Sequence, residues 1–158
     1  MTQPTIPSIT IDTGIKRIAI NNDPDRIISF NPKDINFAER FFKLVDELET
    51  KWEKYQIRYA EILEDTSEDK NNLPNNMQDQ IELVKTFCNE MIELIDNVFG
   101  EGTSSTVFQG QLNPEMFVQF IEGITPFIQS TRSEVVKRYL PPEKIKSRSK
   151  PRSRTKKK

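Results

Sequence analysis

The sequence has 158 residues, of which 35% are hydrophobic and 30% charged, so it predicts one domain with a modest core and a heavily solvated surface. It contains no histidine and one cysteine, which excludes an intramolecular disulfide, a zinc site built on paired cysteines and histidine-dependent catalysis. The net charge of −1 hides an acidic body, because residues 1–143 hold 14 basic and 24 acidic residues, whereas residues 144–158 hold nine basic and no acidic ones.

The N-terminal 30 residues predict a short arm followed by β-structure. Residues 1–7 hold two prolines and few apolar side chains, so we expect a flexible arm. Isoleucines in residues 9–11 and 18–20 alternate with other residue types, which is typical of strands, and residues 12–14 (Asp-Thr-Gly) favour a turn. A second turn at residues 22–25, followed by the apolar pair Ile28 and Phe30, allows a third strand. We therefore expect a β-hairpin or a three-stranded sheet within residues 8–30.

Apolar side chains that recur every three or four residues predict three main helices, at about residues 32–65, 77–99 and 114–138. Asn31-Pro32 is expected to open the first helix, because asparagine caps helices and proline fits the first helical position. A first helix of about 32 residues would be a rod of roughly 48 Å. Its far half must therefore project from the domain or pair with another helix.

Glycine and proline residues mark the expected ends and weak points of these helices. Gly100 occupies the position of a left-handed cap after the second helix. Thr103 is a candidate cap for one short helical turn that follows. Gly123 and Pro126 lie inside the third helix, where they predict a kink or a break.

The predicted fold class is α+β and mostly helical, with a single domain over residues 8–140. Residues 141–158 lack apolar periodicity and are rich in basic residues, so we expect a disordered basic tail. The N-terminus lacks the pattern of a signal peptide, and no run approaches the roughly 18 apolar residues of a membrane span. We therefore expect no association with a membrane.

No pattern in the sequence predicts catalytic, cofactor-binding or metal-binding residues, and we expect that the protein is not an enzyme. Carboxylate pairs on the helices are typical of solvated faces. Gly100-Glu101-Gly102 follows a helix rather than a strand and lacks the lysine of a phosphate-binding loop. Residues 67–72 offer oxygen ligands but lack the glycine and terminal glutamate of a calcium loop. Cys88 lies on an apolar helix stripe and is predicted to be a small buried side chain.

The candidate partner-binding residues fall into two groups. Trp52, Tyr55 and Tyr59 lie on the outer half of the first helix, where they face a partner if that half projects and belong to the core if it does not. The basic residues of the tail form the second group and can bind nucleic-acid phosphates, dock on an acidic protein surface or serve solubility alone. No aromatic residue lies among them, so base stacking is not indicated. This second group comprises Lys144, Lys146, Arg148, Lys150, Arg152, Arg154, Lys156, Lys157 and Lys158.

Three segments of the sequence carry a family resemblance. The first is I-S-F-N-P-K-D-I-N-F-A-E-R-F-F (28–42), which runs into a long charged helix. The second, I-D-N-V-F-G-E-G-T-S-S-T-V-F-Q-G (95–110), is the most specific, and the third is N-P-E-M-F-V-Q-F-I-E-G-I-T-P-F-I (113–128). Together they resemble the small tail assembly chaperone-like proteins of long-tailed phages of Gram-positive hosts, which are encoded beside the tape-measure gene. The resemblance covers roughly residues 8–130.

This resemblance implies a role in phage tail assembly, in the cytoplasm of the host cell. Such a protein binds the tape-measure protein, keeps it soluble and helps to recruit tail-tube subunits around it; no catalytic residue and no cofactor is implied. Three amphipathic helices and an acidic body are compatible with this role, because a groove between helices accepts a client helix. Two alternatives stay open: a nucleic-acid-associated protein that acts through its basic tail, and a structural component of the virion.

Overall fold

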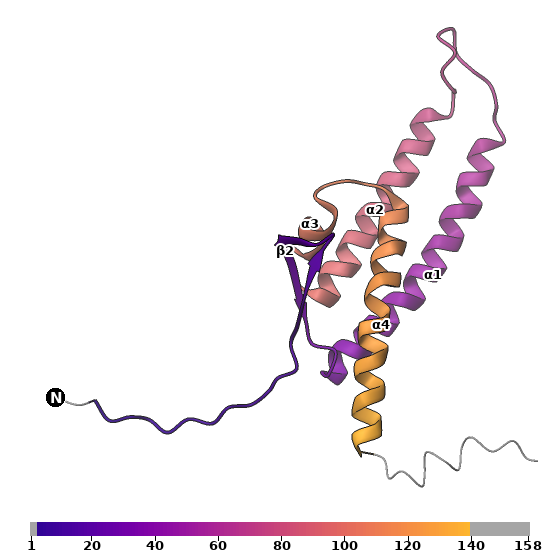
Figure 1. The fold of residues 1–158 in the computed structure, drawn as a ribbon. Coiled ribbons are helices and arrows are strands. Elements are labelled where there is room, and N and C mark those ends of the chain that lie inside the picture. Colours follow the sequence, from indigo (N-terminus) through magenta and orange to yellow (C-terminus); the bar gives the residue numbers. More distant parts are fainter. Residues whose placement is uncertain (1–2, 140–158) are drawn as a thin grey trace, which may run out of the picture.

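The chain folds as a mostly helical α+β protein in which a two-stranded β-hairpin precedes four helices (Figure 1). This confirms the predicted fold class and excludes a three-stranded sheet within the part of the chain that is described. The computed structural model describes residues 3–139, with side chains as far as residue 133. The elements are β1 (Lys16–Ile20), β2 (Asp23–Phe30), α1 (Ile35–Leu63), α2 (Met77–Phe99), α3 (Thr103–Phe108) and α4 (Pro114–Tyr139).

The turn of the hairpin lies at Asn21 and Asn22. Both residues have a positive φ, 53° and 59°, which suits a tight two-residue turn and which asparagine tolerates better than most residues. β1 and β2 run antiparallel, with Ile18 opposite Ile28, and the pairing becomes irregular next to the turn. Ile18 and Ile28 therefore point to one face of the hairpin, the face that is buried against the helices.

The strand expected at residues 9–11 is absent, and the turn expected at residues 12–14 is not a hairpin turn. Residues 12–14 instead contact the segment that follows β2, where Asn31 Nδ2 donates to the Thr13 carbonyl oxygen at 2.6 Å. The exposed arm consequently covers residues 3–15 rather than 1–7, and it extends away from the hairpin and the helices (Figure 1).

Helix α1 begins three residues later than predicted. Its cap is Asp34, whose carboxylate accepts a hydrogen bond from Asn36 N at 3.0 Å. The Asn31 side chain instead accepts from Lys33 N at 3.1 Å and closes a turn, and Pro32 is buried ahead of the helix. The prediction that Asn31-Pro32 starts the helix is therefore wrong. Both Asn31 and Asp34 are suitable cap residues, and Asp34 is the one that caps α1.

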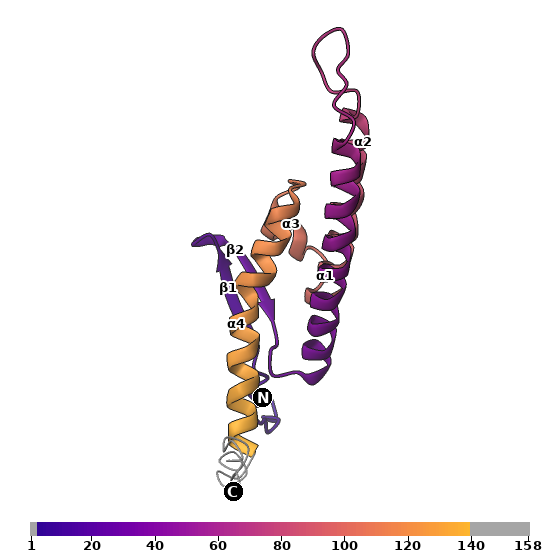
Figure 2. The same ribbon diagram turned by 90° about the vertical axis from the view of Figure 1, so that its right-hand side faces the viewer.

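Helices α1 and α2 lie side by side and antiparallel over most of their length (Figures 1 and 2). The far half of α1 thus pairs with another helix, one of the two outcomes that its length predicted. The buried Asn76 side chain joins the two helix ends, because its Nδ2 donates to the Ile62 carbonyl at 2.6 Å and the Asp65 carbonyl at 2.9 Å. These bonds add a side-chain donor to carbonyl groups at the end of α1, where the Ile62 carbonyl also accepts from Asp65 N at 3.4 Å.

The short helical turn predicted after Gly100 is α3, and Gly102, with a φ of 86°, occupies its cap position in place of Thr103. Gly100 has a positive φ of 113°, but its ψ of 151° places it outside the left-handed helical region, so the left-handed cap predicted after α2 is not formed there. Of the kink or break predicted in the last helix, the break is excluded, since α4 continues through Gly123 and Pro126. Pro126 is exposed, so water reaches the carbonyl group that loses its partner there.

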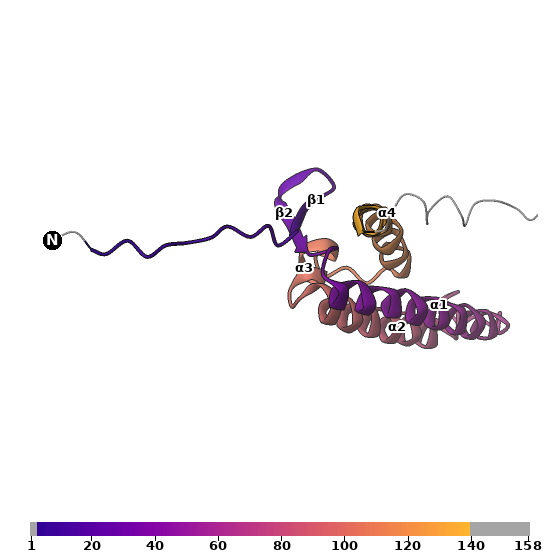
Figure 3. The ribbon, with the colours of Figure 1, turned by 90° about the horizontal axis from the view of Figure 1, so that it is seen from below.

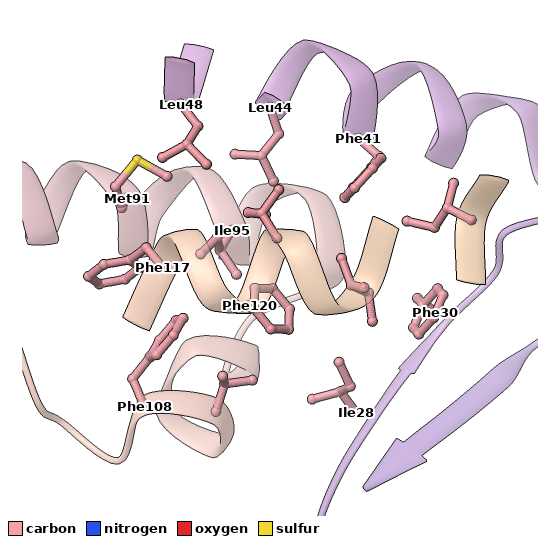
Figure 4. Packing of buried hydrophobic residues seen from close by; sticks show 14 of the residues in the cluster. Ile28, Phe30, Phe41, Leu44, Leu48, Met91, Ile95, Phe108, Phe117 and Phe120 are labelled. Carbon is pink, nitrogen blue, oxygen red and sulfur yellow. The ribbon is translucent and has the colours of Figure 1, made fainter. Parts of the chain in front are cut away.

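Viewed from below, the elements form two layers (Figure 3). Helices α1 and α2 make one layer, and the hairpin and α4 make the other, with α3 against β2 and α2. Between the layers lies an aromatic core, in which side chains of all four helices and of β2 point toward one another (Figure 4). The Phe99 ring is central to one end of it, with centroids 5.3–6.1 Å from those of Phe30, Phe37, Phe41 and Phe120.

Candidate partner-binding groove

The aromatic side chains Trp52, Tyr55 and Tyr59 lie in a row along α1 and are half-buried. Adjacent ring centroids are 5.5 and 5.8 Å apart. One side of the row packs on α2, because the Phe87 ring lies 5.7 Å from Trp52 and 4.9 Å from Tyr55, and the Tyr59 hydroxyl donates to Gln80 Oε1 at 3.3 Å. Partial burial, and secondly the neighbouring Tyr59, raises the pKa of Tyr55. The row is therefore part of the α1–α2 contact, and not a fully exposed platform.

The other side of this aromatic row borders an open groove between α1 and α4. The groove consists of two adjoining hollows of about 400 and 430 Å³ that share Trp52. It exists because α1 packs along α2, whereas α4 contacts both less extensively. We call it the α1–α4 groove; its apolar lining comprises Val45, Leu48, Trp52, Tyr55, Tyr59, Ala60, Leu63, Pro114, Val118, Ile121 and Pro126.

The polar groups around the α1–α4 groove are acidic or neutral. Three carboxylates border it: Glu49 on α1, and Glu115 and Glu122 on α4. All three side chains are exposed. No lysine or arginine lies among the described lining residues. An apolar floor with an acidic rim is complementary to the apolar face of an amphipathic helix whose flanks are basic.

A second groove separates β1 from α4, and we call it the β1–α4 groove. It has a volume of about 280 Å³ and is lined by residues of β1 and α4. Its floor includes Phe108 of α3 and Phe120 and Ile124 of α4. At its rim, Lys16 Nζ lies 5.6 Å from the centre of the Phe127 ring, an arrangement that favours a cation–π contact.

Cys88 is fully buried in the core, as predicted. Removal of its thiol from water raises its pKa to about 11, so the reactive thiolate is strongly disfavoured at neutral pH. Within residues 3–133, no three His, Cys, Asp or Glu side chains are grouped as a metal site requires. None of the described helices is long and apolar enough to cross a membrane. The basic residues predicted as partner-binding, from Lys144 to Lys158, lie outside the described residues.

The sequence identified the α1 wall of the groove but not its α4 wall. The sequence does not distinguish Val118 and Ile121 as binding residues, because they lie within the broad apolar stripe of the third helix, and Pro126 predicts only a kink or a break there. The breadth of that stripe was the available signal: Phe117 and Ile128 are fully buried, whereas Phe127 and Val118 are not. A helix that is apolar over so wide an arc faces more than one surface.

Comparison with known proteins finds a match to the family described as "Family of unknown function (DUF6673)", over residues 25–158. The match includes β2 from near its start and all four helices, but it leaves out the arm and β1. No curated protein and no solved structure matches the chain.

Proposed function

We infer that this chain, which belongs to the DUF6673 family of unknown function, is a phage tail assembly chaperone that binds the tape-measure protein. It acts without catalysis, in the host cytoplasm, by keeping the client soluble and helping to recruit tail-tube subunits. The observation that carries the proposal is the α1–α4 groove, an apolar channel with an acidic rim between two helices.

The dimensions of the α1–α4 groove suit a helical client. Along α1 its lining runs from Val45 to Leu63, a distance of about 27 Å at the rise of an α-helix. A client helix of about 18 residues would span the groove. An apolar side chain at every third or fourth position of that helix would then face the apolar lining on either side of Trp52. A tape-measure protein is a long helical chain, and its exposed apolar stripes are the surfaces that need cover before the tube forms.

The charge of the α1–α4 groove favours one kind of helix over another. Glu49 and Glu122 lie on opposite sides of the groove, so a client helix with basic residues beside its apolar stripe meets a carboxylate on each flank. An acidic helix would meet repulsion from both sides. Such complementarity contributes more to specificity and association rate than to affinity.

The three segments that carry the resemblance to tail assembly chaperone-like proteins meet in the core of this fold. Phe37 from the first contacts Phe99 from the second, with ring centroids 5.4 Å apart. Phe108 from the second contacts Phe117 from the third at 4.4 Å. The resemblance therefore concerns residues that hold α1, α2 and α4 together, and so the scaffold that creates the groove.

Co-expression of the full chain with the tape-measure protein of the same genome tests the proposal. We expect the client to be soluble and to co-purify with the tagged chain. The variant Glu49→Lys/Glu122→Lys should lose most of the client, because both flanks of the groove then repel basic residues. The matched control is Glu93→Lys/Asp79→Lys, which makes the same charge change at exposed positions of α2 outside the groove and should retain the client.

Three results would contradict the proposal. In the first, the client stays insoluble or does not bind. In the second, both double variants bind equally, which would exclude the α1–α4 groove. In the third, the chain binds DNA in a salt-dependent way that deletion of residues 144–158 abolishes, and ignores the client; this would favour the nucleic-acid alternative.

A further inference from the structure

The N-terminal arm is apolar, uncharged and exposed. Residues 3–11 (QPTIPSITI) contain no charged residue, in a protein with 30% charged residues. Ile9 and Ile11 are 85% and 71% exposed, and Ile6 is 86% exposed. Isoleucine is seldom left in water at adjacent alternate positions, and Ser8–Ile11 has the alternation and β-branched side chains of a strand. The arm therefore has the composition of a strand that lacks a sheet.

Contacts at the base of the arm direct it away from its own body. Thr13 and Asp12 lie beside the segment after β2: Asn31 Nδ2 donates to the Thr13 carbonyl at 2.6 Å, and Lys33 Nζ lies 3.6 Å from the Asp12 carboxylate. Gly14 has a φ of 80°, and a Cβ atom there would lie only 2.6 Å from Lys33 Cδ. These contacts lie on the β2 side of the chain, so the arm continues past the hairpin and does not turn back along β1.

The same molecule has an open strand edge beside an apolar groove. Among the described residues β1 pairs only with β2, so its outer edge presents unpaired backbone groups. That edge borders the β1–α4 groove. Ile18 and Ile20 of β1 point to the buried face of the hairpin, toward Phe120 and Ile124.

We propose that the arm of one copy of this chain binds in the β1–α4 groove of a second copy and adds a third strand beside β1. Residues 8–11 pair with the β1 backbone, and Ile9 and Ile11 extend the apolar face made by Ile18 and Ile20 over α4. Ser8 and Thr10 then face solvent. Pro7 has no N–H to donate and ends the pairing, which is compatible with a new edge strand.

A second copy is the occupant that the contacts at the base of the arm favour. To pair with its own β1, the arm would have to reverse direction at residues 12–14. The contacts of these residues with Asn31 and Lys33 instead direct the chain away from β1. A different protein bound in the β1–α4 groove would leave the isoleucines of the arm exposed. Exchange between copies covers the isoleucines and the strand edge together. This inference does not depend on the proposed client, since the α1–α4 groove stays free.

Cysteine cross-linking between two differently substituted chains tests the proposal. One full-length chain carries Ile11→Cys, and the other carries Gln119→Cys, an exposed position in the β1–α4 groove. The native Cys88 is fully buried and does not compete. On mild oxidation of the mixture we expect a disulfide-linked heterodimer. With Thr10→Cys in place of Ile11→Cys, the yield should fall severalfold, because the side chain at position 10 points to solvent.

Light scattering across a concentration series provides the second measurement. The full chain should self-associate, and Ile11→Lys should raise the dissociation constant by about tenfold or more, because the buried isoleucine is lost. Thr10→Lys, which adds the same charge to the other face of the strand, should leave the association nearly unchanged. These arm positions are exposed, so neither variant threatens folding.

Each contrary result overturns the proposal. A chain that remains monomeric at all concentrations excludes exchange. A chain with both Ile11→Cys and Gln119→Cys that cross-links only within itself shows that the arm binds its own groove. Equal effects of Ile11→Lys and Thr10→Lys would show that the arm does not bind as a strand with one buried face.

Discussion

The guanidinium group of Arg26 in β2 donates a 2.5 Å hydrogen bond to the Val107 carbonyl oxygen at the end of α3. Its Nε also donates to the Thr106 carbonyl at 3.1 Å. The two bonds join residues about 80 positions apart and place a positive charge at the C-terminal end of α3, where helix carbonyls are otherwise unpaired. They also fix α3, which supplies part of the floor of the β1–α4 groove.

Replacement of Arg26 should therefore destabilise the hairpin and α3 together. We expect Arg26→Ala to lower the free energy of unfolding by about 1–3 kcal/mol, because a charged donor to two carbonyl groups is lost. Urea denaturation followed by the fluorescence of Trp52, the single tryptophan, measures this. Arg17→Ala, at an exposed position of β1, is the control and should change stability by less than about 0.5 kcal/mol. Similar losses in both variants would mean that the contact of Arg26 with α3 contributes little.

The buried Asn76 side chain should stabilise the far end of the α1–α2 pair. Asn76→Ala removes donors to the Ile62 and Asp65 carbonyls and the oxygen that accepts from Gln80 Nε2 at 2.7 Å. We expect a loss of about 2 kcal/mol and faster amide hydrogen exchange at this end, with little change around the core.

A second variant and a control separate the role of Asn76 from a general effect of the loop. Asn76→Asp should cost more than Asn76→Ala, because a carboxylate would face two carbonyl oxygens. Asn75→Ala removes only an exposed bond to Ser67 Oγ and should have a small effect. Uniform acceleration of exchange over the whole chain in Asn76→Ala would argue against a local role.

Stability should fall in alkaline solution because of Cys88 and, to a lesser extent, Tyr55. Burial raises the pKa of the Cys88 thiol from 9.0 to about 11 and also raises the pKa of Tyr55. The unfolded chain therefore releases protons at a lower pH than the folded chain. The contribution of Cys88 is complete below about pH 9 and is lost as the pH rises toward about 11.

Thermal unfolding measured at several pH values from neutral to alkaline tests this dependence. Cys88→Ala should unfold at a lower temperature at neutral pH, because it leaves a small cavity, but its stability should fall less steeply above pH 9. Alkylation of Cys88 should also be slow in the folded chain and fast in urea. Parallel pH profiles for the two proteins would show that the thiol is not protected by the fold.

Much of the helical framework follows from local patterns in the sequence. α2 covers the residues that its apolar stripe predicted. Gly100 ends the helix, and the stripe that includes Cys88 is its buried side. The extent of α4 was close to its prediction, but Pro126 did not break the helix, since burial of Phe117 and Ile128 on both sides outweighs one lost hydrogen bond.

The aromatic wall of the candidate groove was visible in the sequence, but its exposure was not. Trp52, Tyr55 and Tyr59 share one helix face at any packing, because three or four residues separate them along the helix. Whether that face meets a partner or the core depends on α2, whose Phe87 covers one side of the row. Local sequence contains no information about how far α4 stays from α1, and it is this distance that leaves the other side open.

Amino-acid types and periodicity alone determined that this chain is a mostly helical α+β protein with a buried thiol. The tertiary structure decided which isoleucines form the hairpin and which remain exposed. Residues 9–11 and 18–20 have the same alternation, so local preference cannot rank them. The strand that pairs is the one whose Ile18 and Ile20 face Phe120 and Ile124, and burial of that face settles the register.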